Sequence, residues 1–150
     1  MSTTPVHAIP VHGGLFEETA EGPRLRGTRC RACARHHFPA SDGCPFCGSA
    51  DVEAVALSPT GTLWGWTGVT AAPPGYDGPV PFGFGVVELP EGLRVITRLE
   101  EPDPSRLEFG QRMILVLAEV GTTDHGDPTV TYSFRADSLF GHGATPEVGQ

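Results

Sequence analysis

Residues 30–48 read CRACARHHFPASDGCPFCG, and the two C-x-x-C pairs in this stretch contain every cysteine of the 150-residue chain. Each C-x-x-C turn directs two thiolates toward one point, and two such turns complete a tetrahedral four-sulfur site. Structural zinc is the usual occupant, although iron binds the same set of ligands. The spacing therefore predicts a zinc ribbon that binds one Zn²⁺ per chain through Cys30, Cys33, Cys44 and Cys47.

The predicted coordination leaves no open position on the metal, which indicates a structural role rather than activation of water or substrate. His36 and His37 lie between the two turns and are interpreted as surface or packing residues, because four sulfurs suffice. Five arginines lie between residues 24 and 35, a stretch without any acid. Either they offset the negative charge of the thiolates, or some of them bind phosphate groups.

The rest of the chain is acidic, since the formal net charge is −8, and all ten cationic side chains are arginines. Acids outnumber arginines from residue 57 onward, which argues against nucleic-acid binding. No apolar run approaches the roughly 20 residues that a membrane helix needs, and the N-terminus lacks the pattern of a secretory signal. We therefore expect a cytoplasmic protein with reduced thiols and no membrane association.

The stretch GGLFEETAE at residues 13–21 predicts a short helix with a partly apolar face that includes Leu15, Phe16 and Thr19. Leu15 and Phe16 would dock a partner if exposed; the alternative is that the helix packs on its own domain. The expected division of the chain is an N-terminal segment with this helix at 1–23, the zinc ribbon at 24–50, a second domain at 55–137 and a flexible tail at 138–150.

Five segments after Gly48 alternate apolar and polar residues, as half-buried strands do: 61–70, 82–89, 94–100, 112–120 and 129–136. In the first of them, Trp64 and Trp66 are expected on one face. Five curled strands in about 80 residues favour an OB-type barrel. The predicted fold class is all-β with a short N-terminal helix, in which a rubredoxin-like four-cysteine zinc ribbon precedes a five-stranded OB-fold barrel.

The connection AAPPGYDGPVPFGFG at residues 71–85 is long and rich in proline and glycine. Long loops in compact domains are often functional, and this one is a candidate binding surface. The alternative is a solvated connection between two strands.

The order of these features resembles a family of zinc-ribbon plus OB-fold proteins, the domain of unknown function thirty-five family. The chain has Ala34 and Ala40 where the family usually has Gly and Pro; neither change removes a metal ligand, but Ala34 is expected to affect the local turn. The resemblance covers roughly residues 12–137 and rests most specifically on Arg29-Cys30, Phe38-Pro39, CPFCG at 44–48, Gly61-Thr62 and PPGY at 73–76.

The resemblance implies a small partner subunit of a thiolase-like enzyme, whether a thiolase, an acyltransferase or an aldolase such as a steroid side-chain retro-aldolase. It implies that the enzyme supplies the catalytic groups, while this chain forms a hetero-oligomer with it and helps to shape an acyl-CoA tunnel. Candidate contacts with the partner or with acyl-CoA are Arg24, Arg26, Arg29, Trp64, Trp66, Pro74, Tyr76, Phe82 and Phe84, with Arg94 and Arg98 as further candidates for CoA phosphates.

The chain offers no catalytic motif of its own. All four cysteines are committed to metal, no serine lies in a G-x-S-x-G turn, and the six histidines form no H-E-x-x-H pattern. We therefore expect no catalytic residue in this chain. Two other functions remain open: a single-stranded nucleic-acid binder, since OB barrels occur in that class, and an electron carrier with iron in place of zinc.

Overall fold

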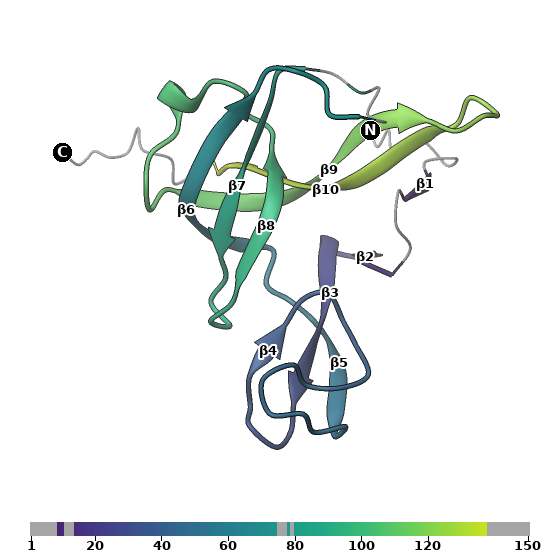
Figure 1. Ribbon diagram of the computed structural model, residues 1–150, viewed down its shortest axis with the longest axis vertical. Helices are drawn as coiled ribbons and strands as arrows, with labels where there is room; N and C mark the ends of the chain where they lie inside the picture. The colour runs from purple at the N-terminus through teal and green to yellow at the C-terminus, as the bar shows by residue number, and fades with distance from the viewer. Residues whose placement is uncertain (1–8, 11–13, 75–77, 79, 138–150) are drawn as a thin grey trace.

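A computed structural model describes residues 9–10, 14–74, 78 and 80–137, and shows a small ribbon beside a larger barrel (Figure 1). Within these residues there is no α-helix, and none of the structure described has a helix of the length and apolar character that crossing a bilayer requires. The elements are β1 (Ile9–Pro10), β2 (Phe16–Thr19), β3 (Gly22–Cys30), β4 (His36–His37), β5 (Val52–Ala56), β6 (Thr60–Val69), β7 (Phe82–Glu88), β8 (Arg94–Leu99), the 3-10 turn η1 (Pro104–Arg106), β9 (Arg112–Thr122) and β10 (Pro128–Ala136).

The short helix predicted near the N-terminus is wrong. The chain forms β2 there, which pairs antiparallel with β3 so that Phe16 lies opposite Leu25. Gly14 and Gly22 have positive φ angles of 85° and 117° and permit turns at the two ends of β2. The pairing with β3 provides hydrogen-bond partners for the backbone N–H and C=O groups of β2. This pairing outweighs the weak helical periodicity of the segment.

The docking helix predicted from Leu15 and Phe16 is therefore absent. The carbonyl oxygen of Leu15 accepts a hydrogen bond from the backbone N–H of Arg26 at 2.8 Å, which continues the pairing with β3. Phe16 packs against the protein's own hydrophobic core. Both residues thus hold the N-terminal segment to the ribbon.

The ribbon is organised around β3, which pairs antiparallel with β2, β4 and β5. Gly27 lies in the middle of β3, where neighbouring chains approach closely. A Cβ atom at this position would lie 2.7 Å from the carbonyl oxygen of His37 and 2.8 Å from a methyl carbon of Leu57. Only glycine fits such an approach without displacing the neighbouring backbone.

The five-stranded barrel predicted from the alternating segments is confirmed. Its strands follow the order β6-β7-β8-β10-β9, and β9 pairs with β6 to close the circle. The β8–β10 pairing is parallel, whereas the other barrel pairings are antiparallel. This closure of five strands is the OB topology. The β9–β10 hairpin extends beyond the barrel, and β1 lies along its outer edge (Figure 1).

Trp64 and Trp66 do not share a face, contrary to the strict alternation expected for this strand. A β-bulge interrupts the β6–β7 register between Leu63 and Gly65, and the extra residue shifts the side-chain alternation. Trp64 points outward and is 43% exposed. Trp66 packs against the hydrophobic core, and its indole N–H donates to the carbonyl oxygen of Pro104 at 2.9 Å.

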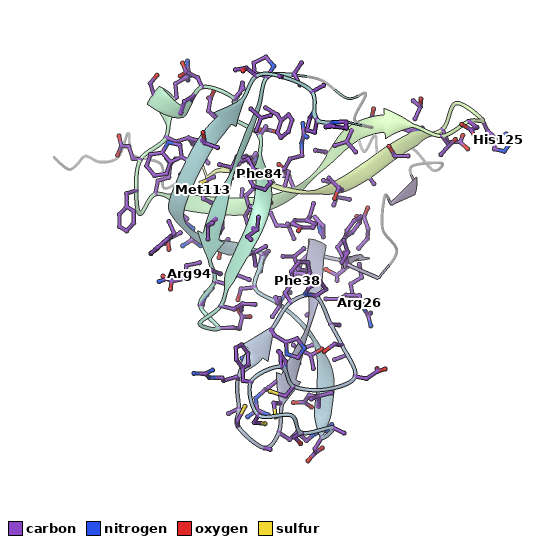
Figure 2. The ribbon with its side chains drawn as sticks, viewed as in Figure 1. Arg26, Phe38, Phe84, Arg94, Met113 and His125 are labelled. Atoms are coloured by element: carbon purple, nitrogen blue, oxygen red, sulfur yellow. The ribbon has the colours of Figure 1, made fainter. Side chains whose placement is uncertain are left out.

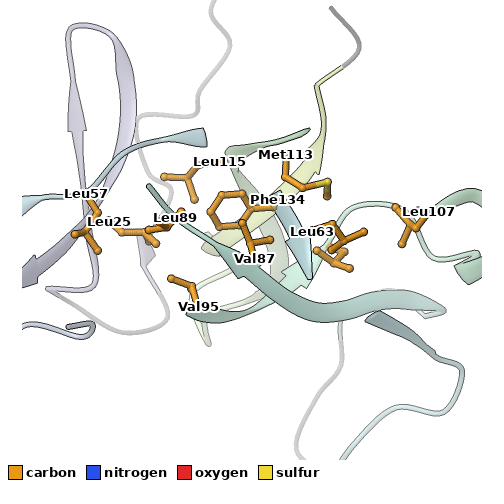
Figure 3. Packing of buried hydrophobic residues seen from close by; sticks show 11 residues of the cluster. Leu25, Leu57, Leu63, Val87, Leu89, Val95, Leu107, Met113, Leu115 and Phe134 are labelled. Carbon is orange, nitrogen blue, oxygen red and sulfur yellow. The ribbon is translucent and has the colours of Figure 1, made fainter. Parts of the chain in front are cut away.

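One hydrophobic core runs through both parts of the molecule. Phe134 of β10 is fully buried within the barrel, and Leu25 and Leu57 from the ribbon side belong to the same cluster. Figure 3 shows Leu25 and Leu57 at one end of this row of side chains and Leu107 at the other. The ribbon is therefore packed onto one end of the barrel rather than tethered to it.

Candidate metal centre and partner surface

The four cysteine sulfurs converge in the ribbon, and all lie within 4.8 Å of one another. The Sγ atoms of Cys30 and Cys47 are 3.6 Å apart, and those of Cys33 and Cys44 are 3.7 Å apart. A tetrahedral ion with metal–sulfur bonds of about 2.3 Å holds its ligands about 3.8 Å from one another. The arrangement therefore fits one metal ion bound by four thiolates.

The two C-x-x-C turns share one backbone geometry. The N–H of Ala34 donates to the carbonyl oxygen of Cys30 at 2.8 Å, and the N–H of Gly48 donates to that of Cys44 at 2.9 Å. Both turns end on a residue with positive φ, 67° at Ala34 and 80° at Gly48. Glycine adopts this conformation freely, whereas alanine loses roughly 1 kcal/mol. Ala34 therefore strains the first turn slightly but preserves its shape.

Backbone N–H groups directed at the sulfurs favour thiolates. At Cys44, burial raises the pKa, but hydrogen bonds from the N–H groups of Cys47 and Phe46 lower it by a larger amount. The pKa of Cys44 therefore falls to about 6. At Cys30, the N–H of Cys33 is the main cause of a lowered pKa. At Cys47, the N–H of Ser49 lowers the pKa, but the neighbouring cysteine side chains raise it to about 11. Thiols this close share protons, and a bound cation would displace them.

The arginines predicted to contact a ligand from the ribbon are engaged within the chain. A carbonyl oxygen or a carboxylate accepts from each of them, so the structure does not gather them at a common ligand surface. The pairs are Arg24 with the carbonyl of Leu57 at 2.7 Å, Arg26 with Glu17 at 2.8 Å, and Arg29 with Glu53 at 3.3 Å.

Exposed apolar side chains gather instead on the outer face of three barrel strands. Phe84 and Ile96 are 41% and 63% exposed, and the register places Val86 opposite Ile96 and Phe84 opposite Arg98. The guanidinium of Arg94 lies 3.9 Å from the ring centre of Trp64, and that of Arg98 lies 4.2 Å from the ring centre of Phe82. The β6–β8 face is defined here as Trp64, Phe82, Phe84, Val86, Arg94, Ile96 and Arg98.

Two other predicted contacts lie in the loop before β7. Pro74 is exposed. Tyr76 falls outside the described residues. Sequence reasoning missed Ile96, although the alternation of Arg94, Ile96 and Arg98 along β8 is a signal that these three side chains share one face.

Comparisons with known proteins match both parts of the chain. The protein-family model described as "ChsH2, rubredoxin-like zinc ribbon domain" matches residues 20–53, and the family model described as "ChsH2, C-terminal OB-fold domain" matches residues 54–118. Benzoylsuccinyl-CoA thiolase subunit BbsA of Thauera aromatica is 32% identical over 126 residues, which cover 83% of this chain and 85% of that protein. A DUF35 domain-containing scaffold protein of Methanocaldococcus jannaschii is 27% identical over 112 residues, which cover 74% and 79% of the two chains.

A solved structure, the Ltp2-ChsH2(DUF35) aldolase, superposes with a TM-score of 0.58 at 30% identity, covering 75% of this chain and 84% of that chain. The fold and the cysteine site thus define a zinc-ribbon and OB-fold protein. The chain belongs to the DUF35 family that includes ChsH2 and BbsA, as its motifs indicated.

Proposed function

We propose that this chain is a non-catalytic accessory subunit that binds a thiolase-like enzyme, namely a thiolase, an acyltransferase or an aldolase. It would support the assembly of that enzyme in the cytoplasm. The names of its relatives support this role, since one is a thiolase subunit, one a scaffold protein, and one part of an aldolase complex. The observation that carries the proposal is the β6–β8 face, on which Trp64, Phe84 and Ile96 are exposed in the part of the chain that the structure describes.

The β6–β8 face has the composition of an interface core. Aromatic and aliphatic side chains lie at its centre, and arginines stack on two of its rings. Trp, Phe and Arg are enriched where protein surfaces meet, because they bury large areas and still offer hydrogen bonds. A steroid side-chain aldolase is one member of the partner class proposed here.

The metal is proposed to be Zn²⁺, with one ion per chain and a structural role. Four sulfurs at tetrahedral separations are the ligand set that structural zinc sites use, and they leave no position for a substrate. Iron bound to the same sulfurs would colour the purified protein, which separates the two ions without a functional assay.

Acyl-CoA is the proposed substrate class of the assembly, because the name of the BbsA relative specifies a CoA thioester. Nucleic acid is not the proposed ligand. Bases stack on open aromatic faces in single-strand binders, whereas the rings of Trp64 and Phe82 are covered by Arg94 and Arg98. Tight, salt-sensitive binding of single-stranded DNA in a gel shift would contradict this assignment.

The test is co-expression with the thiolase-like protein encoded beside it, followed by co-purification. The wild-type chain is expected to co-elute with the enzyme, and the double variant F84D/I96D to lose this association, because it places two charges in the β6–β8 face. Phe109→Asp is the matched control, since Phe109 is 69% exposed but lies outside that face. If the two wild-type proteins elute separately and the enzyme is fully active alone, the proposed function is wrong.

A further inference from the structure

The four cysteines of the ribbon are not equally accessible. Cys30 and Cys44, the first cysteine of each turn, are buried, whereas Cys33 and Cys47, the second of each turn, are exposed. In Figure 2 the yellow sulfur atoms of the ribbon lie on the side that points away from the barrel. An oxidant dissolved in water therefore reaches Cys33 and Cys47 before the two buried cysteines.

Hydrogen bonds to sulfur distinguish the two exposed cysteines from each other. Backbone N–H groups donate to the sulfurs of Cys30 and Cys44 at 3.4–3.5 Å, and the N–H of Ser49 donates to that of Cys47. Among the described residues, no backbone N–H donates to the sulfur of Cys33. A thiolate without such bonds is the stronger nucleophile, because hydrogen bonds withdraw charge from the sulfur.

The turn that contains Cys33 is also the strained one. Ala34, which follows it directly, has a φ angle of 67° and is the one non-glycine residue with a positive φ in the described part of the chain. The second turn has Gly48 at the equivalent place, with a φ angle of 80°. Opening the first turn releases the strain at Ala34, so Cys33 leaves a shared metal ion more readily than Cys47 does.

A second thiolate lies within reach of Cys33. The Sγ atom of Cys44, which belongs to the other turn, is 3.7 Å from that of Cys33. The two atoms need to approach by about 1.7 Å to form a disulfide. Two backbone hydrogen bonds of 2.9 Å, from Gly48 to Cys44 and from Cys44 to Ser49, hold the second turn. The strained first turn is therefore the one that moves.

We propose that the ribbon is a peroxide-sensitive switch, in which Cys33 is oxidised first and Cys44 then forms a disulfide with it. The Cys33 thiolate attacks one oxygen of hydrogen peroxide, the O–O bond breaks, hydroxide leaves, and Cys33 becomes a sulfenic acid. The Cys44 thiolate attacks this sulfur, the S–O bond breaks, and a second hydroxide leaves. Two electrons pass from the two sulfurs to the peroxide.

The disulfide would remove two of the four metal ligands. The thiolates that remain, Cys30 and Cys47, are too few for a structural zinc site, so the metal is released and the ribbon loses stability. Leu25 of β3 belongs to the core that the ribbon shares with the barrel, and this contact carries the effect into the barrel. The switch goes beyond the proposed function, since it requires no partner, and it relies only on the metal proposed above.

The experiment treats the full-length, zinc-loaded chain with an equimolar amount of hydrogen peroxide. A chromogenic chelator follows zinc release, while dimedone traps sulfenic acid and mass spectrometry locates it. The first label is expected on Cys33. Without dimedone, a disulfide between Cys33 and Cys44 should accumulate together with free zinc, and dithiothreitol with fresh zinc should restore the starting protein.

Two matched variants change the strain of the turns and leave every ligand in place. Ala34→Gly should slow zinc release about 5-fold, because removing roughly 1 kcal/mol of strain corresponds to that factor. Gly48→Ala introduces the same strain into the second turn, where an added Cβ meets nothing within 4 Å, and should shift labelling toward Cys47.

Three results would overturn the switch: a first label on any cysteine other than Cys33, zinc release from Ala34→Gly as fast as from the wild-type chain, or retention of zinc in excess peroxide. A chain that binds no zinc before peroxide is added would refute the metal and the switch together. Co-elution with the thiolase-like protein is measured without peroxide, so it tests the proposed function separately.

Discussion

Replacement of Leu57 by alanine tests whether ribbon and barrel fold as one unit. Leu57 is fully buried, its N–H donates to the carbonyl oxygen of Leu25 at 2.9 Å, and its side chain joins the cluster that also contains Leu115. Leu-to-Ala changes at fully buried sites cost about 2.7–5 kcal/mol, and tight packing against Gly27 leaves little room for the cavity to collapse. We expect a loss of about 3 kcal/mol, or a fall in Tm of about 6–12 °C.

The assay is urea denaturation followed with two probes in one sample. Tryptophan fluorescence reports the barrel, because Trp66 packs against its core, and a chromogenic chelator reports release of the ribbon metal. The control is Leu63→Ala, which removes the same group from a buried position inside β6. Both variants should shift both transitions by similar amounts, because a shared core unfolds in one cooperative step.

The reasoning fails if Leu57→Ala changes the free energy of unfolding seen by fluorescence by less than about 1 kcal/mol while metal release moves to lower urea. A change of that size is hardly larger than the effect of a typical surface substitution. That outcome would show that the ribbon opens independently, and that the contact between Leu25, Leu57 and the barrel contributes little to stability.

Three further predictions follow from local geometry. Cys44→Ser should reduce bound zinc well below one ion per chain, measured by atomic emission, and chelation of the wild-type metal should unfold the ribbon, because structural zinc contributes directly to folding. Gly85→Ala should cost about 1–3 kcal/mol in urea denaturation, because its Cβ would collide with the carbonyl oxygen of Gly65, whereas Gly65→Ala, where a Cβ meets nothing within 4 Å, should be nearly neutral. The hydroxyl and N–H of Ser105 hold the pKa of Asp103 below its ordinary value. The stability from this contact is therefore complete above the ordinary pKa and is lost as the pH falls through the lower pKa of the folded protein. Ser105→Ala should raise the pKa of Asp103, which a ¹³C NMR titration measures.

The strands of the barrel could be predicted because a half-buried strand leaves a two-residue period in its own sequence. The N-terminal segment could not. Its residues Leu15, Phe16 and Thr19 fit a helical face, but the partner that decides their structure is β3, and the signal of that pairing lies in two different segments. The bulge at Trp64, between Leu63 and Gly65, could not be predicted either, because one extra residue changes the face of Trp66 without changing the composition of the strand.

The cysteine site was predictable because all four ligands lie in one short stretch with a spacing that only a few geometries satisfy. The contacts of the arginine side chains could not be predicted. A long flexible side chain can reach several partners, and the distribution of charge along the sequence does not show that Arg26 pairs with Glu17 while Arg35 stacks on Phe46.

The shared core also bears on how this chain can be inherited and recombined. Family models divide it between residues 53 and 54, as though it were two exchangeable modules. Leu25 and Leu57 lie on opposite sides of that division, yet they pack in one cluster with barrel residues. A gene fusion that took either half alone would expose this cluster to water, so ribbon and barrel are expected to travel together when the protein is joined to other domains.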